Sequence, residues 1–182
     1  MGKSSLAAYL SHVNSNDLVM DFAVKELIPT ITNTPIVFGL NATDPLIDLY
    51  SYIKSLKDIG FIGINNYPTV GLFDGKFKEA LEEEGTSFDL EVEAIKIANF
   101  LDMLTIAFVF DLEQARKMLE AQADIICVHL GLTKGGLKGA VKVLSLEKAK
   151  ILAQEIFDLC DEIRPEVIKM IYGGPVKTPI DA

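Results

Sequence analysis

The sequence predicts an α/β fold of the (β/α) barrel type, built as a single domain over residues 1–182. Two patterns lead to this expectation. Five short runs rich in β-branched residues are almost continuously apolar, which is typical of strands buried on both faces of a parallel sheet. Between these runs, apolar residues recur with a period of about 3.6, as in amphipathic helices. A barrel is favoured over an open nucleotide-binding sheet, because no GxGxxG or GxxxxGKS/T phosphate loop follows any run.

The strands and the first helix are predicted in a fixed order along the chain. The five predicted strands are residues 35–40, 61–66, 104–110, 124–130 and 167–173. A helix of about residues 16–27 precedes the first of them.

The helix after the first strand is predicted to begin at Thr43-Asp44-Pro45. A capping residue there precedes a proline suited to the first helical turn. The apolar residues of this segment fall on one face of a helix, namely Leu46, Leu49, Tyr50, Ile53, Leu56 and Ile59.

Three further helices are predicted from periodicity and capping residues. One covers 90–101, and the next opens with Asp111 and Gln114 at capping-box spacing. The last begins at Ser145, runs through Ile163 and stops before Pro165.

Two long insertions follow the carboxyl ends of predicted strands, at 67–89 and 131–144. Ligands bind at that edge in α/β folds, because loops there vary without disturbing the core. The insertions therefore mark the expected mouth of the barrel.

The number of strands falls short of a closed barrel, which has eight strands and about 250 residues. Five strands are visible here, so the barrel is expected to be incomplete at both ends. Such an arc leaves bare strand edges at 36–40 and 167–172, which invite pairing with another copy. We therefore expect a homo-oligomer, in which a second chain could complete the barrel.

Composition limits the compartment and the partners. The net charge is −9 without any Lys/Arg cluster, which argues against nucleic acid as a partner but leaves a small anionic metabolite open. No apolar run is long enough to span a membrane, and the first residues lack a secretory signal. Cys127 and Cys160 lack metal-site spacing and are expected as reduced core thiols of a cytoplasmic protein.

Several motifs in this order resemble the phosphoenolpyruvate hydrolase-like family, also labelled TIM-barrel signal transduction proteins. The motifs are TDP (43–45), NYPTVGLFDGKF (66–77), LEEEG (81–85), LEVEAI (90–95), HLGLTKGG (129–136) and GGP (173–175). The family also forms the C-terminal domain of a plant tobamovirus-resistance inhibitor. The resemblance implies a TIM barrel without its first two β/α units and its last strand. It also implies an activity on small phosphorylated or phosphono 2-oxo acids.

The sequence departs from the family pattern in two places. Tyr172 stands before GGP where the family usually has histidine, and Leu40-Asn41-Ala42 replaces a small polar or glycine-rich turn before TDP. Both departures weaken an enzymatic interpretation.

His129 and Glu91 are the titratable candidates. His129 ends its strand, where a barrel aims catalytic side chains into the mouth, so it could act as a general acid or base or bind a metal. The alternative is a histidine satisfied by neighbouring carbonyls. Glu91 lies on a polar helix after a long insertion that could cover the site, whereas the acidic run 82–84 is expected on a solvated face.

Two glycine-rich loops are candidate anion sites. One is formed by Gly131, Thr133, Lys134, Gly135 and Gly136, and its backbone could form a nest for an anion. The other contains Gly173 and Gly174, after the last visible strand, where barrels often hold phosphate. A flexible loop and a simple tight turn are the respective alternatives.

Polar residues end the strand 61–66 and follow the strand 35–40. Asn65 and Asn66 could hold the oxygens of a carboxylate or an enolate, or could merely close a turn. Asp44 is a weak candidate for Mg²⁺ and is more simply a helix cap. Otherwise the cofactor is unknown.

The combined hypothesis is hydrolysis or lysis of a small phosphorylated or phosphono 2-oxo acid, with His129 moving protons. Asn65 and Asn66 would hold the oxygens of the substrate, and the glycine loops its anionic group. Two alternatives are a non-catalytic ligand-sensing or interaction domain and an inactive truncated remnant.

Overall fold

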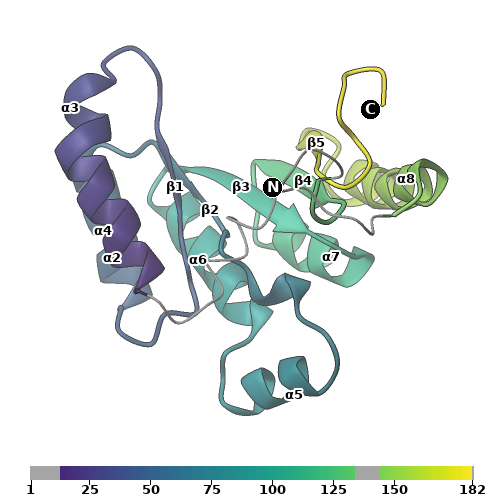
Figure 1. Cartoon of the computed structure of the whole chain (residues 1–182), viewed down its shortest axis with the longest axis horizontal. Helices are drawn as coiled ribbons and strands as arrows, with labels where there is room; N and C mark the ends of the chain where they lie inside the picture. The colour runs from purple at the N-terminus through teal and green to yellow at the C-terminus, as the bar shows by residue number, and fades with distance from the viewer. Residues whose placement is uncertain (1–12, 134–143, 182) are drawn as a thin grey trace.

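Five parallel strands form one sheet in the order β1-β2-β3-β4-β5. The computed structural model describes residues 13–133 and 144–181 (Figure 1). The strands are β1 Val37–Gly39, β2 Gly63–Asn65, β3 Leu104–Val109, β4 Ile125–His129 and β5 Ile168–Tyr172. Each lies inside a predicted strand, and the predicted fold class is confirmed. The described strands form an open arc of the TIM-barrel type.

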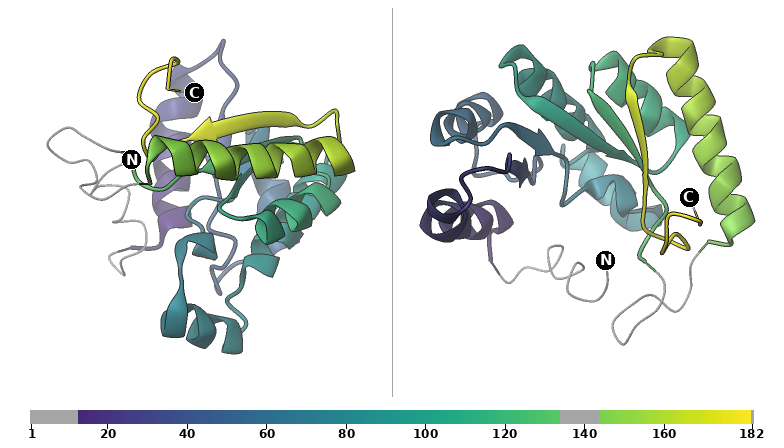
Figure 2. Two further views of the ribbon diagram at one scale, coloured as in Figure 1. Left: turned by 90° about the vertical axis from the view of Figure 1, so that its right-hand side faces the viewer. Right: turned by 90° about the horizontal axis from the view of Figure 1, so that it is seen from above.

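Four helices cover one face of this sheet. They are α4 Leu49–Ile59, α6 Phe88–Phe100, α7 Leu112–Glu120 and α8 Leu146–Ile163. Neighbouring helices in this row contact one another, and α6, α7 and α8 also contact the strands (Figure 2). The core lies in this layer, because Phe38, Ile64, Ala107, Ile126 and Val128 are 0–1% exposed beneath the helices.

The opposite face of the sheet carries the alternate side chains of each strand, which the four helices do not cover. Register pairs Asn65 with Ile106, Phe108 with Cys127 and His129 with Tyr172. Since alternate residues of a strand share a face, these six side chains point away from the helices. This face is called the mouth face below.

Strand β5 is an exposed edge of the described sheet. Its mouth-face residues Ile168, Met170 and Tyr172 are 56%, 43% and 41% exposed, and β1 forms the other edge. Unpaired edges of this kind favour pairing with another chain. Oligomerisation through them stays a prediction.

Most predicted helix ends are confirmed. The side chain of Ser145 accepts from the N–H of Lys148 at the start of α8, and α6 begins two residues before its predicted start. Asp111 accepts from the N–H of Gln114 over 2.8 Å. The second half of that capping box is absent, because Gln114 Oε1 instead accepts from the N–H of Phe110 over 3.0 Å.

The predicted start of the helix after β1 is wrong. Helix α4 begins at Leu49, and its N-cap is Asp48, whose side chain accepts from the N–H of Ser51. Asp44 instead accepts from the N–H of Leu46 over 2.9 Å within a turn. Its Oδ2 accepts from the side-chain amides of Asn14 and Asn16 at the N-terminal helix. The chain therefore turns at Pro45 before helix α4 starts.

The N-terminal helical segment comprises α2 Ser15–Phe22, the π-helical stretch Ala23–Leu27 and α3 Ile28–Thr30. It agrees with the prediction for 16–27 and extends slightly beyond it. Asn16 is fully buried and docks this segment on the loop after β1. Its side chain accepts from the N–H of Asn41 over 2.9 Å and donates to the carbonyl of Asn41 over 3.0 Å.

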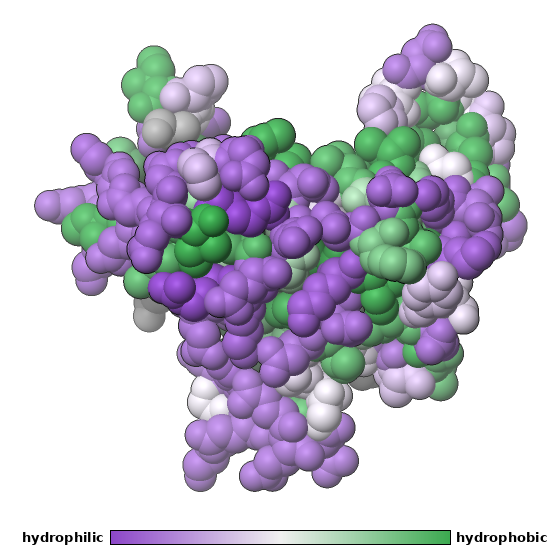
Figure 3. Space-filling model, turned by 180° about the vertical axis from the view of Figure 1, so that it is seen from behind, coloured by the Kyte–Doolittle hydropathy of each residue, from purple (hydrophilic) through white to green (hydrophobic). Residues whose placement is uncertain are grey.

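The insertion between β2 and α6 contains the short η3 Val70–Leu72 and helix α5 Gly75–Glu83, which were not predicted. Helix α5 buries none of its residues. It forms the largely hydrophilic lobe at the bottom of Figure 3. Glu82, Glu83 and Glu84 are exposed there, as predicted for a solvated face.

Within residues 13–133 and 144–181, none of the helices combines the length and the apolar character that crossing a bilayer would require.

Candidate functional site

The carboxyl ends of the strands bring several predicted residues to one edge of the sheet. Asn65 ends β2, His129 ends β4, and Gly173 and Gly174 follow β5. Asn65 and His129 share the mouth face through the register described above. The candidate site is this edge.

Aromatic rings surround His129. Its ring centroid lies 5.7 Å from Phe108, 4.9 Å from Phe110 and 5.4 Å from Tyr172. Tyr67 extends the cluster, with its ring 6.2 Å from Phe108. His129 is only 2% exposed, whereas Tyr172 on the edge strand is 41% exposed. A ligand that reaches the imidazole must therefore displace a neighbouring ring, and Tyr172 is the most exposed of the three that contact it.

A backbone hydrogen bond favours the tautomer of His129 that is protonated on Nε2. The backbone N–H of Gly131 donates to Nδ1 over 3.1 Å, and an accepting ring nitrogen carries no proton. Burial lowers the pKa of His129 from 6.5 to about 4, so the ring is neutral near pH 7 with its proton on Nε2. The side chain is therefore suited to donate a hydrogen bond from Nε2, and not to remove a proton.

The two glycine loops interlock. The N–H of Gly174 donates to the carbonyl of Gly131 over 2.9 Å, and a Cβ on Gly173 or Gly174 would collide with a carbonyl oxygen of Gly131 or Leu130. These glycines permit close packing of backbone on backbone. The N–H groups of Gly131 and Gly174 are thus already used within the protein.

The remaining loop residues are only partly described. Thr133 is the last described residue of the loop after β4, and it already interacts with another group of the protein. Lys134, Gly135 and Gly136 lie outside the described residues, so the predicted anion nest stays a prediction.

Asn66 points to the opposite face from Asn65 and joins β2 to β3. Its Oδ1 accepts from the N–H of Phe108 over 2.7 Å, and its Nδ2 donates to the carbonyl of Phe108 over 3.1 Å and to Glu91 over 2.5 Å. Asn66 is 2% exposed. The two asparagines therefore differ in role, and only Asn65 faces the mouth.

Glu91 is fully buried behind the loop that follows β2. Its carboxyl group accepts from Asn66 Nδ2, from the hydroxyl of Thr69 over 2.8 Å and from the N–H of Val70 over 2.7 Å. Burial raises the pKa of Glu91 from 4.5 to about 8, although the three hydrogen bonds pull it down. Glu91 thus clamps the loop to α6 and does not face the mouth.

Asn65 shapes the beginning of the same loop. Its Oδ1 accepts from the N–H of Tyr67 over 3.1 Å, and a cis peptide bond joins Tyr67 to Pro68. The Asn65 side chain lies on the mouth face.

Asp44 does not fit a magnesium site. Its Oδ2 accepts from Asn14 over 2.7 Å and from Asn16 over 3.0 Å, and its Oδ1 accepts from Leu46. In the described part of the chain, no three His, Cys, Asp or Glu side chains gather into a group that could hold a metal ion. The hydrogen bonds of Asp44 fasten the N-terminal helix to the loop after β1.

The aromatic neighbours of His129 were not predicted from the sequence. Phe108 and Phe110 lie two residues apart in a predicted strand, and Tyr172 ends another. The period-2 alternation of strands was the available signal, because it places Phe108 and Phe110 on one face. Which face lines the mouth depends on where the helices pack.

A family model described as phosphoenolpyruvate hydrolase-like matches residues 1–182 of the chain. The chain belongs to this family. The expected resemblance is confirmed.

Relatives in the phosphoenolpyruvate hydrolase-like family come from a plant and a bacterium. Two proteins of Solanum lycopersicum, ToMV susceptible protein tm-1(GCR26) and ToMV resistance protein Tm-1(GCR237), are each 40% identical over 181 residues, which cover 100% of this chain and 24% of theirs. "Putative transcriptional regulatory protein y4pA" of Sinorhizobium fredii is 34% identical over 179 residues, covering 98% of this chain and 29% of its own. The chain thus spans roughly a quarter of the length of these curated relatives.

Proposed function

We propose that this domain binds a small phosphorylated or phosphono 2-oxo acid at the carboxyl ends of β2 to β5 without turning it over. His129 donates a hydrogen bond from Nε2 to an oxygen of the ligand, and Asn65 offers its carboxamide from the same face. The observation that supports this most directly is the neutral, Nε2-protonated His129 at the end of β4.

Binding is favoured over hydrolysis by the state of the two titratable candidates. Nδ1 of His129 is occupied by Gly131, and Glu91 is buried away from the mouth face in a network of its own. General acid–base catalysis needs a group that can exchange a proton with the reacting atoms near the working pH. The names of the relatives describe virus resistance or susceptibility and transcriptional regulation, which also supports a sensing role.

Neutral donors suit the partial charges of a carboxylate or an enolate oxygen, because a neutral imidazole polarises an oxygen without transferring a proton. The exposed Tyr172 is the ring that we expect to move when the ligand enters.

We further propose a reducing, cytoplasmic setting, which is supported by the free and buried thiols of Cys127 and Cys160.

Thermal unfolding with phosphoenolpyruvate tests this function. We expect the midpoint to rise saturably, because a ligand that binds only the native state stabilises it by about 2.7 kcal/mol at 100 times its Kd. Oxalate should act in the same way, and propionate should not. The rise should be lost in His129→Phe, which keeps a ring in the cluster but removes both nitrogens.

Pyruvate release is measured in the same samples, with EDTA and then with Mg²⁺. We expect no acceleration over buffer. Acceleration that disappears in His129→Phe would overturn the binding-only proposal and restore the hydrolase hypothesis. An unfolding midpoint that none of these ligands changes would contradict both the binding and the hydrolase hypotheses. It would favour the alternative of a protein-interaction domain.

A further inference from the structure

A pocket lies beside helix α5, and none of the rings that contact His129 lines it. It has a volume of about 220 Å³. Its walls come from three segments: the loop after β1 with Asn41 and Thr43, residues 68–70 after β2, and the α5 region with Phe73, Phe77 and Thr86. This site is called the α5 pocket below.

Hydrogen bonds on two sides hold the walls of the α5 pocket in place. Glu91 anchors Thr69 and Val70, and Gln114 Nε2 donates to the carbonyl of Gly71 over 3.3 Å. Asn16 fixes the backbone of Asn41 on the opposite wall. These two walls are therefore in place before any ligand arrives, which lowers the entropic cost of binding.

The lining of the α5 pocket carries no ionisable side chain among its described residues. Phe73 and Phe77 pack edge to face, with ring centroids 5.1 Å apart, and Phe77 is 60% exposed. These rings offer an apolar surface to a flat ligand. A charged ligand would lose its hydration here without gaining an ionic partner.

Two polar groups of the lining have unused hydrogen-bonding capacity. Asn41 Oδ1 accepts from the hydroxyl of Thr43 over 3.0 Å, whereas its Nδ2 donates to no group of the described residues. The hydroxyl of Thr86 likewise has no partner in the described ranges 13–133 and 144–181. Together they provide amide and hydroxyl donors beside an aromatic wall.

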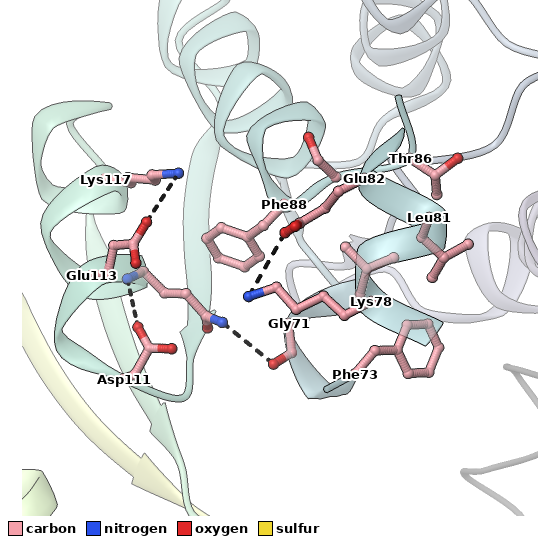
Figure 4. Close-up of a pocket in the computed structure, with 13 residues that line it drawn as sticks. Gly71, Phe73, Lys78, Leu81, Glu82, Thr86, Phe88, Asp111, Glu113 and Lys117 are labelled. Carbon is pink, nitrogen blue, oxygen red and sulfur yellow. Dashed lines mark hydrogen bonds and ion pairs between the residues drawn. The ribbon is translucent and has the colours of Figure 1, made fainter. Parts of the chain in front are cut away.

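A neighbouring pocket on the other side of the same insertion has the opposite character. Figure 4 shows Lys78 facing Glu82, and Lys117 facing Glu113, around that pocket. The two pockets share residues such as Phe73 and Leu81. The two pockets therefore differ in the charge of their linings, since ionisable side chains line only the one drawn in Figure 4.

We propose that the α5 pocket binds an uncharged ring compound that carries a carbonyl group. The ring packs on Phe73 and Phe77, and the carbonyl accepts from Asn41 Nδ2. This site shares no lining residue with the aromatic cluster around His129, and it does not depend on the function proposed for that cluster.

Titration with benzamide and benzoate tests the α5 pocket, because the two probes share a ring but differ in charge. Amide resonances are followed in a ¹⁵N-labelled chain. We expect benzamide to shift the resonances of Thr43, Val70 and Phe77 saturably, with a Kd on the order of millimolar for a fragment of this size. Benzoate should bind at least about tenfold more weakly, since burial of its charge is uncompensated.

Two variants control the experiment. Phe77→Ala removes an exposed ring, so the chain should still fold, and it should weaken benzamide binding about tenfold. Phe100→Ala, at a ring that is 76% exposed at the end of α6, should leave binding unchanged. Equal binding of both probes, equal effects of both variants, or no saturable shift at these three amides would each overturn the proposal.

Discussion

Glu91→Ala should destabilise the protein by roughly 3–5 kcal/mol, the range expected when a buried polar network loses its central member. The substitution leaves a cavity in α6 and strands three buried donors, those of Asn66, Thr69 and Val70. The loop after β2 should lose its anchor, and with it the α5 pocket. Urea unfolding of the wild type and the variant gives the difference.

Glu93→Gln is the matched control for this prediction. Glu93 lies on the same helix, is exposed and pairs only loosely with Lys96 at 3.9 Å, so its loss should change the free energy of unfolding by less than about 0.5 kcal/mol. Equal effects of the two substitutions would refute the role assigned to Glu91.

The pH dependence of stability carries a second signature of Glu91. The pKa of the folded state, about 8, exceeds the ordinary value of 4.5, so the folded chain binds this proton more tightly than the unfolded chain does. Its contribution is therefore fully present below pH 4.5 and is lost as the pH rises through 8, by at most about 1.4 kcal/mol per pH unit. Glu91→Gln should remove this decline.

Between pH 6.5 and pH 8, the change in the free energy of unfolding with pH reports on Glu91 without a contribution from His129. The pKa of His129 is lowered to about 4, so its own contribution is complete above 6.5 and is lost only as the pH falls through 4. A Glu91→Gln chain with the same decline as the wild type above pH 6.5 would show that another group causes it.

Gly174→Ala should cost at least about 3 kcal/mol. Gly174 has φ +58°, and a Cβ there would meet the carbonyl oxygen of Leu130 and, at 2.8 Å, the Leu130 Cβ. Neither atom can move easily, because Leu130 N also donates to the carbonyl of Tyr172 over 2.9 Å. The contact between the loops after β4 and β5 should open, with loss of the Gly131 bond to His129.

Gly75→Ala separates conformational strain from collision. Gly75 has the same φ of +58°, but no atom lies within 4 Å of a Cβ placed there. Its substitution should cost only about 1–2 kcal/mol, the price of the left-handed conformation. Similar unfolding midpoints for the two alanine variants would contradict the close packing inferred at Gly174.

The sequence was sufficient to predict the strands and most helices, because their signals are local. Continuous apolar runs located all five strands, and Ser145 correctly marked the start of α8. Thr43-Asp44-Pro45 failed as a helix start because Asp44 is bound by Asn14 and Asn16, nearly 30 residues earlier. A long-range contact outweighed the local capping signal there.

The candidate site was only partly predictable for the same reason. The strand-end position of His129 follows from sequence, whereas its neutral state depends on the rings of Phe108, Phe110 and Tyr172, which the sheet register brings together. Asn65 and Asn66 look equivalent in sequence but point to opposite faces. Glu91 was selected as a mouth residue, and only tertiary packing shows that it holds the loop from behind.

The most direct test of the proposed binding site is the ¹⁵N NMR spectrum of the His129 ring. His12→Gln leaves His129 as the single histidine of the chain, which has two. We predict the Nε2-protonated neutral tautomer from about pH 8 down to about pH 5, and a saturable shift of the Nε2 signal on addition of phosphoenolpyruvate. Protonation near the ordinary pKa of 6.5, or an Nε2 signal that phosphoenolpyruvate leaves in place, would contradict it.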